Sequence, residues 1–246
     1  MPRIGLGTKL ELPNTSVVMG STGPPAGALI MLLPSSIANS GGFVTQWTDV
    51  SGNSRDYDPY SGSTPSAVVP YSATGFNGGP CVDATSVGYM RREFGHNIAD
   101  TGELTYSAVY DLGGTDIYVV VDWADKIRTI VTSTTLQANE HHGGDVVIMT
   151  TGAVSTALRL IITLNRLTGN GAMYVNGSSV STSTAVTKTH ILQSNGSLGH
   201  NTFGARSDGA DRANIKMAAL CAYDRDMTAS GEVAALDNYL ISQCGF

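Results

Sequence analysis

The sequence predicts an all-β domain, a sandwich of two antiparallel sheets, on three observations. Short apolar or alternating segments recur with turn residues every ten or so positions, a spacing typical of sandwiches. The 29 glycines, among many serines and threonines, predict numerous turns rather than long helices. Only the C-terminal part of the chain has the periodicity of a helix. At 246 residues, one domain of this size accounts for the chain.

Residues 1–25 are predicted to form an extended N-terminal arm, and residues 26–246 to form the sandwich. Glycines and prolines, among them Pro13, Pro24 and Pro25, interrupt any regular element in the arm. The arm also contains apolar residues such as Leu10 and Val17, in which a disordered tail is normally poor. We therefore expect either a loose terminus or an arm that docks on a neighbouring subunit.

The strands of the sandwich are predicted from short apolar runs, taken in chain order. The first covers Ala28–Leu33. Asn176-Gly177 predicts a hairpin with a type I′ turn, because both residues tolerate a positive φ. Further strands are predicted at residues 104–111, 117–121, 127–131, 146–149, 158–164, 172–180, 191–198 and 215–223.

The chain is predicted to end in a buried strand, a polar turn and one short helix. Residues 215–223 are apolar at nearly every position, which is typical of a strand covered on both faces. Thr228 is the expected N-cap of the helix. Val233, Leu236 and Leu240 fall on one stripe of that helix, at i, i+3 and i+7.

Three segments, in the right order, carry a resemblance to a known family. Residues 47–53 read W-T-D-V-S-G-N, residues 75–83 read G-F-N-G-G-P-C-V-D, and residues 220–228 read L-C-A-Y-D-R-D-M-T. Together they resemble the laminin-G-like, concanavalin-A-like lectin-glucanase jelly-roll family. The resemblance covers about residues 26–243 and implies a two-sheet antiparallel jelly-roll sandwich. Two features depart from the family pattern: Asp83-Ala84-Thr85 replaces Phe-Asp-Gly, and Thr228 and Glu232 are four residues apart instead of three.

Five residues of these segments are predicted to be structural anchors. Trp47 is expected in the core, and Tyr223 belongs to the final buried strand. Asp49, Gly52 and Asn53 are expected to form a turn closed by side-chain hydrogen bonds to the backbone.

The segment from Arg55 to Gly62 contains the candidate glycan-binding residues Tyr57, Asp58 and Tyr60. Exposed aromatic rings stack on the C–H faces of sugars, and carboxylates accept hydrogen bonds from sugar hydroxyls. The same composition is typical of an ordinary surface turn, so both interpretations stay open.

Metal and catalytic candidates are few. Asp208 and Asp211 supply the hard oxygens that calcium prefers, and calcium is familiar in laminin-G-like domains, so this loop is the candidate calcium site. No other cofactor is expected. The Glu140-His141-His142 run is interpreted as a loop without metal. The five glutamates are too far apart in sequence to form the paired carboxylates of a glycoside hydrolase, so we expect no enzyme.

Composition limits the partners and suggests a function. A net charge of −6 argues against nucleic acid, and no apolar run approaches the roughly 20 residues of a membrane span. The start of the chain lacks the apolar segment of a secretory signal, so we expect either synthesis without one or a leader that has been removed. We expect a non-enzymatic virion protein, a phage capsid decoration or fibre protein at the virion surface that forms a homo-oligomer. Its arm would bind a capsid or tail subunit, and it would display a jelly roll to host glycans. The alternatives are a free carbohydrate-binding module and a polysaccharide-cleaving enzyme.

Overall fold

The structure is a computed structural model of the 246-residue chain. It describes residues 23–61, 64–66, 68–84, 88–92, 102–112, 118–123, 127–132, 135–141, 145–152, 157–186, 201–205 and 214–246. The predicted arm falls almost entirely outside these ranges, as does the strand predicted at residues 191–198.

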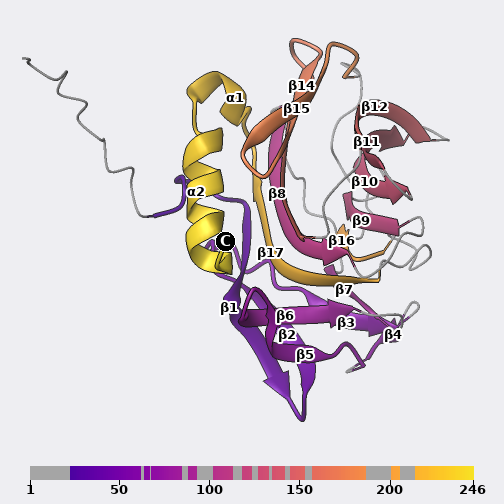
Figure 1. The fold of residues 1–246 in the computed structure, drawn as a ribbon, viewed down its shortest axis with the longest axis vertical. Coiled ribbons are helices and arrows are strands. Elements are labelled where there is room, and N and C mark those ends of the chain that lie inside the picture. The colour runs from indigo at the N-terminus through magenta and orange to yellow at the C-terminus, as the bar shows by residue number, and fades with distance from the viewer. Residues whose placement is uncertain are drawn as a thin grey trace, which may run out of the picture.

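The first of two sheets has nine strands, all paired antiparallel, and lies next to the C-terminal helix (Figure 1). Its main path runs β15-β14-β13-β8-β17-β1-β2, and β6 joins it at β17 with β5 beside β6. Its strands are β1 (Ile30–Ser40), β2 (Phe43–Asp49), β5 (Tyr71–Phe76), β6 (Gly79–Ala84), β8 (Glu103–Leu112), β13 (Ala157–Asn165), β14 (Asn170–Val175), β15 (Ser178–Ser183) and β17 (Ile215–Tyr223).

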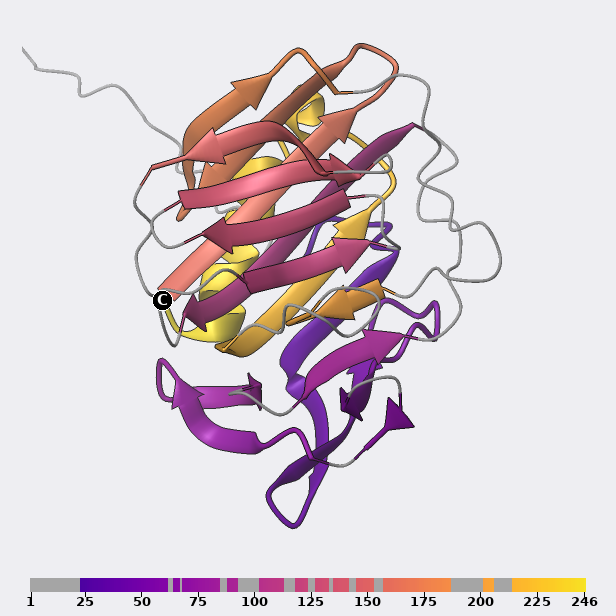
Figure 2. The ribbon, with the colours of Figure 1, turned by 90° about the vertical axis from the view of Figure 1, so that its right-hand side faces the viewer.

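The second sheet has eight strands and lies against the other face of the first (Figure 2). Its order is β12-β11-β10-β9-β16-β7-β3-β4, again with antiparallel pairing. Its strands are β3 (Asp58–Ser61), β4 (Thr64–Pro65), β7 (Tyr89–Arg92), β9 (Tyr118–Trp123), β10 (Ile127–Thr132), β11 (Thr135–His141), β12 (Asp145–Thr151) and β16 (Asn201–Phe203).

The main core fills the space between the two sheets. Because side chains alternate along a strand, each strand sends every second residue inward. Trp47 from the first sheet stacks on Phe203 from the second, with ring centroids 6.0 Å apart. Tyr106 of β8 shares a 2.7 Å hydrogen bond with Thr129 of β10, which joins the sheets across the core. The predicted two-sheet sandwich is confirmed.

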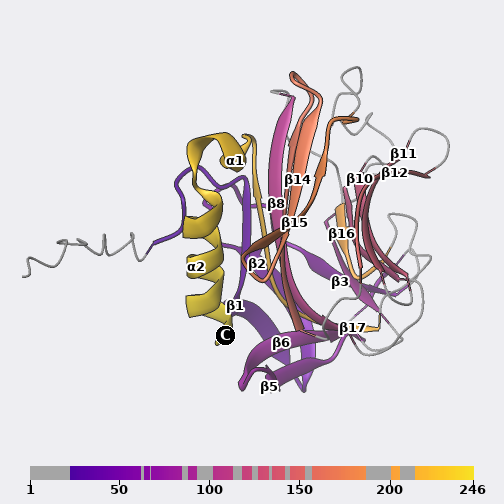
Figure 3. The same cartoon turned by 45° about the horizontal axis from the view of Figure 1, so that its top comes forward.

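The C-terminal helix covers the outer face of the first sheet (Figures 1 and 3). It is α2 (Val233–Cys244), and the predicted stripe of Val233, Leu236 and Leu240 is buried. These side chains form a second apolar layer with Cys221 and Tyr223 of β17. The sheet is therefore covered on both faces, which explains why β17 is apolar at nearly every position. No helix among the described residues is long and apolar enough to cross a membrane.

A separate helical turn, α1 (Met227–Ser230), precedes α2 and corrects one prediction. Thr228 is not the N-cap. Asp226 caps α1 instead, because its carboxylate accepts a 2.9 Å hydrogen bond from the Thr228 backbone N–H. Gly231 then ends α1 in the left-handed region, with φ +72°. Its backbone N–H donates to the carbonyls of Met227 and Thr228.

Several predicted elements are confirmed almost residue for residue. β17 has the predicted bounds, and β8, β9, β10, β12 and β13 each overlap a predicted strand. Asn176 and Gly177 both have positive φ, +50° and +82°, as a type I′ turn requires. The short strand β16 was not predicted, because three residues are too few to show a period.

Candidate functional site

Two of the predicted anchors, Trp47 and Tyr223, lie in the two apolar layers of the fold. Trp47 is fully buried, and its indole N–H donates a 2.8 Å hydrogen bond to the Leu33 carbonyl. Tyr223 is also buried, beneath α2, with the Arg225 guanidinium 5.1 Å from its ring centroid. Both side chains are buried, as predicted.

Asp49 closes the turn with four hydrogen bonds. Its Oδ1 accepts from the backbone N–H groups of Met31 at 2.8 Å and Ser51 at 2.9 Å. Its Oδ2 accepts from the Ser51 hydroxyl at 2.8 Å and from the Arg55 backbone N–H at 2.9 Å. The carboxylate is only 6% exposed, so it links β1 and the segment after β2 away from bulk water.

Gly52 and Asn53 complete the same turn. Gly52 has φ +88°, a conformation that glycine adopts readily and side-chain-bearing residues rarely do. The Asn53 amide donates to the carbonyls of Ala28 at 2.9 Å and Leu29 at 3.2 Å. The predicted hydrogen-bonded turn is confirmed, and its role is to fix the chain on which β3 begins.

The predicted glycan-binding tyrosine Tyr57 points into the core instead. It is fully buried, and its backbone exchanges two hydrogen bonds with Trp47, at 2.7 and 2.9 Å. Burial raises the pKa of its hydroxyl well above the ordinary value. A ring in this position has no face free for a sugar, so the prediction for Tyr57 is wrong.

Tyr60 is on the opposite face of the second sheet, but it is covered. It is 1% exposed, beside the Tyr89 ring at 6.1 Å, and the Arg91 guanidinium lies 4.6 Å from its ring centroid. The arginine occupies the ring face on which a sugar would stack. The prediction for Tyr60 is therefore also wrong.

Asp58 is the one predicted glycan-binding residue that the structure leaves exposed. It lies between Tyr57 and Pro59 on β3, and alternation turns its side chain away from the core. The Gln46 side-chain amide donates a 3.4 Å hydrogen bond to its Oδ1. This contact is long, and it orients a carboxylate that stays accessible to solvent.

The Asp58 carboxylate lines an open surface groove with a volume of about 330 Å³. Four other residues line the groove: Thr45 of β2, Pro59 of β3, Pro65 of β4 and the adjacent Ser66. A 2.9 Å hydrogen bond from the Ser66 N–H to the Pro59 carbonyl holds the β3–β4 turn in place. We call this feature the Asp58 groove.

The chemistry of the Asp58 groove suits a hydroxyl-rich ligand. The carboxylate accepts hydrogen bonds, and the exposed Thr45 side chain carries a hydroxyl that both donates and accepts. The exposed Pro65 ring adds a rigid apolar surface. Of the groove residues only Asp58 was predicted, because the others come from strands whose pairing the sequence does not reveal.

A row of polar residues continues from Asp58 across the outer face of the second sheet. In register, Asp58 lies opposite Arg91, Arg91 opposite Thr202, and Arg128 opposite Asn139 further along. Directly opposite residues share a face of the sheet. The residues of this row beyond Asp58 do not extend the groove as an open surface, because each is at most 5% exposed: Arg91, Thr202, Arg128 and Asn139.

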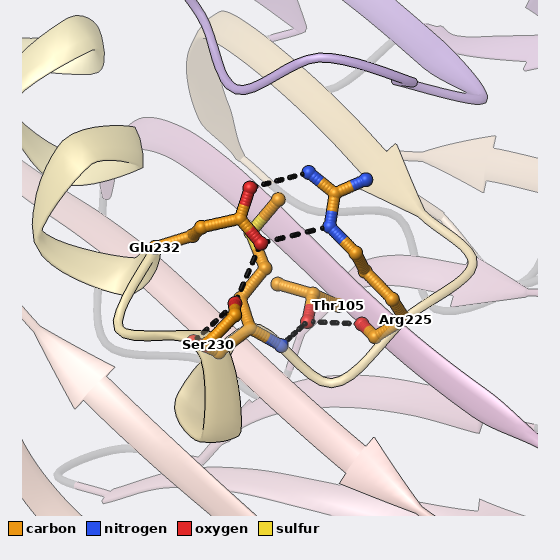
Figure 4. A network of polar contacts seen from close by, with 5 residues as sticks. Thr105, Arg225, Ser230 and Glu232 are labelled. Carbon is orange, nitrogen blue, oxygen red and sulfur yellow. Dashed lines mark hydrogen bonds and ion pairs between the residues drawn. The ribbon is translucent and has the colours of Figure 1, made fainter.

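One glutamate, Glu232, is bound to its neighbours in the C-terminal turn (Figure 4). Its two oxygens accept from Arg225 at 2.8 and 3.0 Å, and Ser230 donates to one of them. The hydrogen bonds from Arg225, the largest cause, lower the pKa of Glu232. In the same view the Thr105 hydroxyl donates to the Arg225 carbonyl at 2.7 Å and accepts from the Met227 N–H at 3.1 Å.

The other two glutamates in the described ranges also make structural contacts. Glu103 accepts from the Asn165 amide at 2.9 Å. Glu140, opposite Ile127 on the inward face of β11, lies 3.6 Å from the Arg166 guanidinium, and both side chains are buried. Burial lowers the pKa of Arg166, and Glu140 raises it by a smaller amount.

The candidate calcium residues Asp208 and Asp211 lie outside the described residues. Within the described ranges, no group of three or more histidine, cysteine, aspartate or glutamate side chains is arranged to hold a metal ion.

The chain resembles solved structures of β-sandwich binding domains. Domain 4 of AbnA, an extracellular arabinanase from Geobacillus stearothermophilus, in complex with arabinotriose, superposes with a TM-score of 0.64 at 10% identity, covering 86% of this chain and 98% of that domain. Botulinum neurotoxin type C, whose entry into cells depends on interaction with two ganglioside molecules, superposes with a TM-score of 0.60 at 15% identity. The match covers 87% of this chain and 51% of the toxin chain. The binding domain of botulinum neurotoxin DC in complex with SialylT superposes with a TM-score of 0.57 at 12% identity. The match covers 87% of this chain and 51% of that chain.

These similarities establish the fold. The chain spans about half the length of the toxin structures and nearly all of the arabinanase domain. No protein-family model matches the sequence, and no curated protein is similar to it at a significant level.

Proposed function

We propose that this protein is a non-catalytic glycan-binding module and that the Asp58 groove is its binding site. The observation that carries the proposal is an exposed carboxylate in an open groove beside a threonine hydroxyl and an exposed proline ring. Structures of the same fold include one in complex with arabinotriose and one whose function involves gangliosides. Both observations favour glycans over other ligands.

The contacts of the three described glutamates support the proposal of a non-catalytic module. A retaining glycosidase needs two carboxyl groups roughly 5–5.5 Å apart, and an inverting one needs them roughly 6.5–9.5 Å apart, both facing the sugar. Glu103, Glu140 and Glu232 instead bind side chains of the protein. In the Asp58 groove, Asp58 is the only carboxylate among the described lining residues. We expect no release of reducing sugar from polysaccharides.

A glycan array on the full-length protein, with and without calcium, tests this proposal. Asp58→Asn removes the charge and one acceptor oxygen, so we expect at least a tenfold loss of affinity for the bound glycan. Asp224→Asn makes the same change of charge at the end of β17, outside the groove, and should bind normally. Calcium dependence would support the Asp208–Asp211 site.

Two results would contradict the proposal in different ways. If the wild-type protein binds no glycan, the proposed function is wrong. If Asp58→Asn binds as well as the wild type, the protein binds glycans at another site.

We further propose that the module is displayed on a virion, as a phage capsid decoration or fibre protein. The supporting observation is the composition of residues 1–25, where glycine and proline accompany apolar residues suited to docking on another virion subunit. Deleting residues 1–25 should abolish incorporation into particles and preserve glycan binding. Full incorporation of the truncated protein would rule out the arm. A free carbohydrate-binding module would bind glycans without associating with particles.

A further inference from the structure

The edge strands of the two sheets differ in how they are protected. β4 has only two residues, one of them Pro65, which donates no backbone hydrogen bond. β2 is bonded along its outer side, where the N–H groups of Val44 and Trp47 donate to Val69 and Tyr57. β5 is interrupted by a register break between its first and last pairs. Short length, proline and irregularity all discourage pairing with another chain.

β12, at the other end of the second sheet, lacks most of these protections. It has seven residues and pairs with β11 alone among the described strands. Its sequence, D-V-V-I-M-T-T, contains neither lysine nor proline. A single β-bulge lies between Val147 and Met149. Before the bulge, Val146 and Val147 are 54% and 49% exposed, among the most exposed large apolar side chains of the described chain.

The neighbouring edge of the first sheet enlarges this apolar surface. β15 contacts β12, so the two sheets meet at this side of the sandwich. β15 is otherwise rich in serine, but its Val180 is 39% exposed. Val146 and Val147 are successive residues, so they flank the edge of β12 on opposite faces of its sheet. Together with Val180 of the contacting strand β15 we call them the valine edge. Apolar groups gathered at an unpaired sheet edge are typical of a pairing surface.

We propose that β12 is the interface of a homodimer, in which two copies pair their β12 strands antiparallel across a two-fold axis. The sequence of the strand favours a second copy as the occupant. Its one charged residue, Asp145, stands at the N-terminal end, and Thr150 and Thr151 stand at the other. Antiparallel pairing about the middle of the strand places each aspartate opposite a threonine and keeps the two negative charges at opposite ends.

The net charge of the chain limits which surfaces can form an interface between two copies. With a charge of −6 on each copy, association needs an interface that buries apolar groups without bringing acidic residues together. The valine edge meets this requirement. Because β12 pairs only with β11 among the described strands, a second copy would pair on its other side and join two eight-stranded sheets into one continuous sheet.

Sedimentation equilibrium of the full-length protein over a range of concentrations tests the dimer. Val147→Lys places a charge on the edge, a device by which natural edge strands prevent pairing. We expect a wild-type dimer and at least a tenfold weaker dimerisation constant for Val147→Lys. Leu167→Lys is the matched control: Leu167 is 67% exposed, follows β13, and lies outside the valine edge, so this variant should remain dimeric.

Three results would overturn the proposal. The first is a wild-type protein that is monomeric at every concentration. The second is a Val147→Lys variant that dimerises like the wild type, which would place the interface elsewhere, for example in residues 1–25. The third is a Leu167→Lys variant whose dimerisation is weakened as much as that of Val147→Lys, which would show a general effect of added charge. Circular dichroism and thermal unfolding of each variant separate loss of pairing from loss of folding.

Discussion

At the scale of single residues, Asp49 shows how one side chain can define a turn. Its two oxygens accept four hydrogen bonds from Met31, Ser51 and Arg55, three of them from backbone N–H groups. A buried backbone N–H that loses its acceptor destabilises the fold, because it has left water and gained no hydrogen bond in exchange. The turn therefore depends on a carboxylate with two accepting oxygens.

Asp49→Asn should destabilise the protein by about 2–4 kcal/mol, because the amide replaces one acceptor with a donor that faces other donors. Urea unfolding followed by tryptophan fluorescence measures the change. Asp58→Asn is the matched control, since Asp58 is exposed and has one long hydrogen bond, so its stability should be within about 0.5 kcal/mol of wild type. Equal stability of the two variants would contradict the role given to Asp49.

The roles of individual residues were predictable where they depend on neighbours in sequence. The W-T-D-V-S-G-N run resembles a family motif, so Trp47 and Asp49 were recognised as anchors. Asp49 bonds to the nearby Ser51 and Arg55, whereas Trp47 bonds to Leu33, 14 residues away in sequence. Tyr60 was misjudged, because Arg91 and Tyr89 cover it from a strand some 30 residues away. Strand register across a sheet decides such contacts, and a single sequence does not encode it visibly.

At the scale of elements, α2 is fixed to the first sheet by more than its apolar stripe. Asp237 of α2 receives two hydrogen bonds from Arg159 of β13, at 2.8 and 3.2 Å, and both side chains are about nine-tenths buried. The same guanidinium lies 4.5 Å from the Phe246 ring centroid, and Phe246 packs edge-on against Phe76 of β5. The pair thus connects β13, the helix and the C-terminus.

Asp237→Ala should cost roughly 3–5 kcal/mol, because it leaves the Arg159 charge buried without its partner. The double variant Arg159→Met with Asp237→Leu removes both charges at similar volume and should recover most of that loss. Thermal and urea unfolding of the single and double variants measure the coupling. If the double variant is less stable than Asp237→Ala, the loss of stability in Asp237→Ala does not come mainly from the unpaired Arg159 charge, and the ion pair itself stabilises the fold.

Elements were predictable from the sequence where the period is long enough to show. The nine residues of β17 and the stripe of α2 were found, because a buried run and a helical stripe are local patterns. β1 extends to Ser40, past the proline at which its prediction stopped, since its later residues pair with β2. The Asp226 cap was missed because both Asp226 and Thr228 are good cap residues, and only the backbone conformation distinguishes them.

At the scale of the whole molecule, the layer under α2 should make stability depend on alkaline pH. Burial raises the pKa of Cys81 to about 11 and those of Cys221 and Cys244 to about 12, against an ordinary value of 9.0. Unfolded thiols therefore lose protons near pH 9 while folded ones keep them. Deprotonation then favours the unfolded chain, so stability is complete below about pH 9 and falls as pH rises toward the folded values.

The urea midpoint should accordingly decrease between pH 8 and pH 10. At pH 8 the three free thiols should resist a thiol reagent in the native protein and react fully in urea. A variant with all three cysteines replaced by alanine is the control, and its midpoint should depend less on pH over this range. Native thiols that react as fast as unfolded ones would contradict the burial of this layer.

The two proposals together predict bivalent binding. The Asp58 groove lies by β3 and β4, at one end of the second sheet, and β12 is the last strand at the other end (Figure 1). A β12 dimer therefore leaves both grooves free, at the two far ends of the joined sheet. On a surface dense in glycans, the second groove binds at a high effective concentration once the first has bound.

Wild-type protein should dissociate from such a glycan surface at least tenfold more slowly than Val147→Lys. For a soluble oligosaccharide the two proteins should have equal affinity, because the groove itself is unchanged. Surface plasmon resonance at high and low glycan density, with calorimetry in solution, makes the comparison. Equal dissociation rates at high density, from a protein shown to be dimeric, would mean that the grooves do not reach the same surface together.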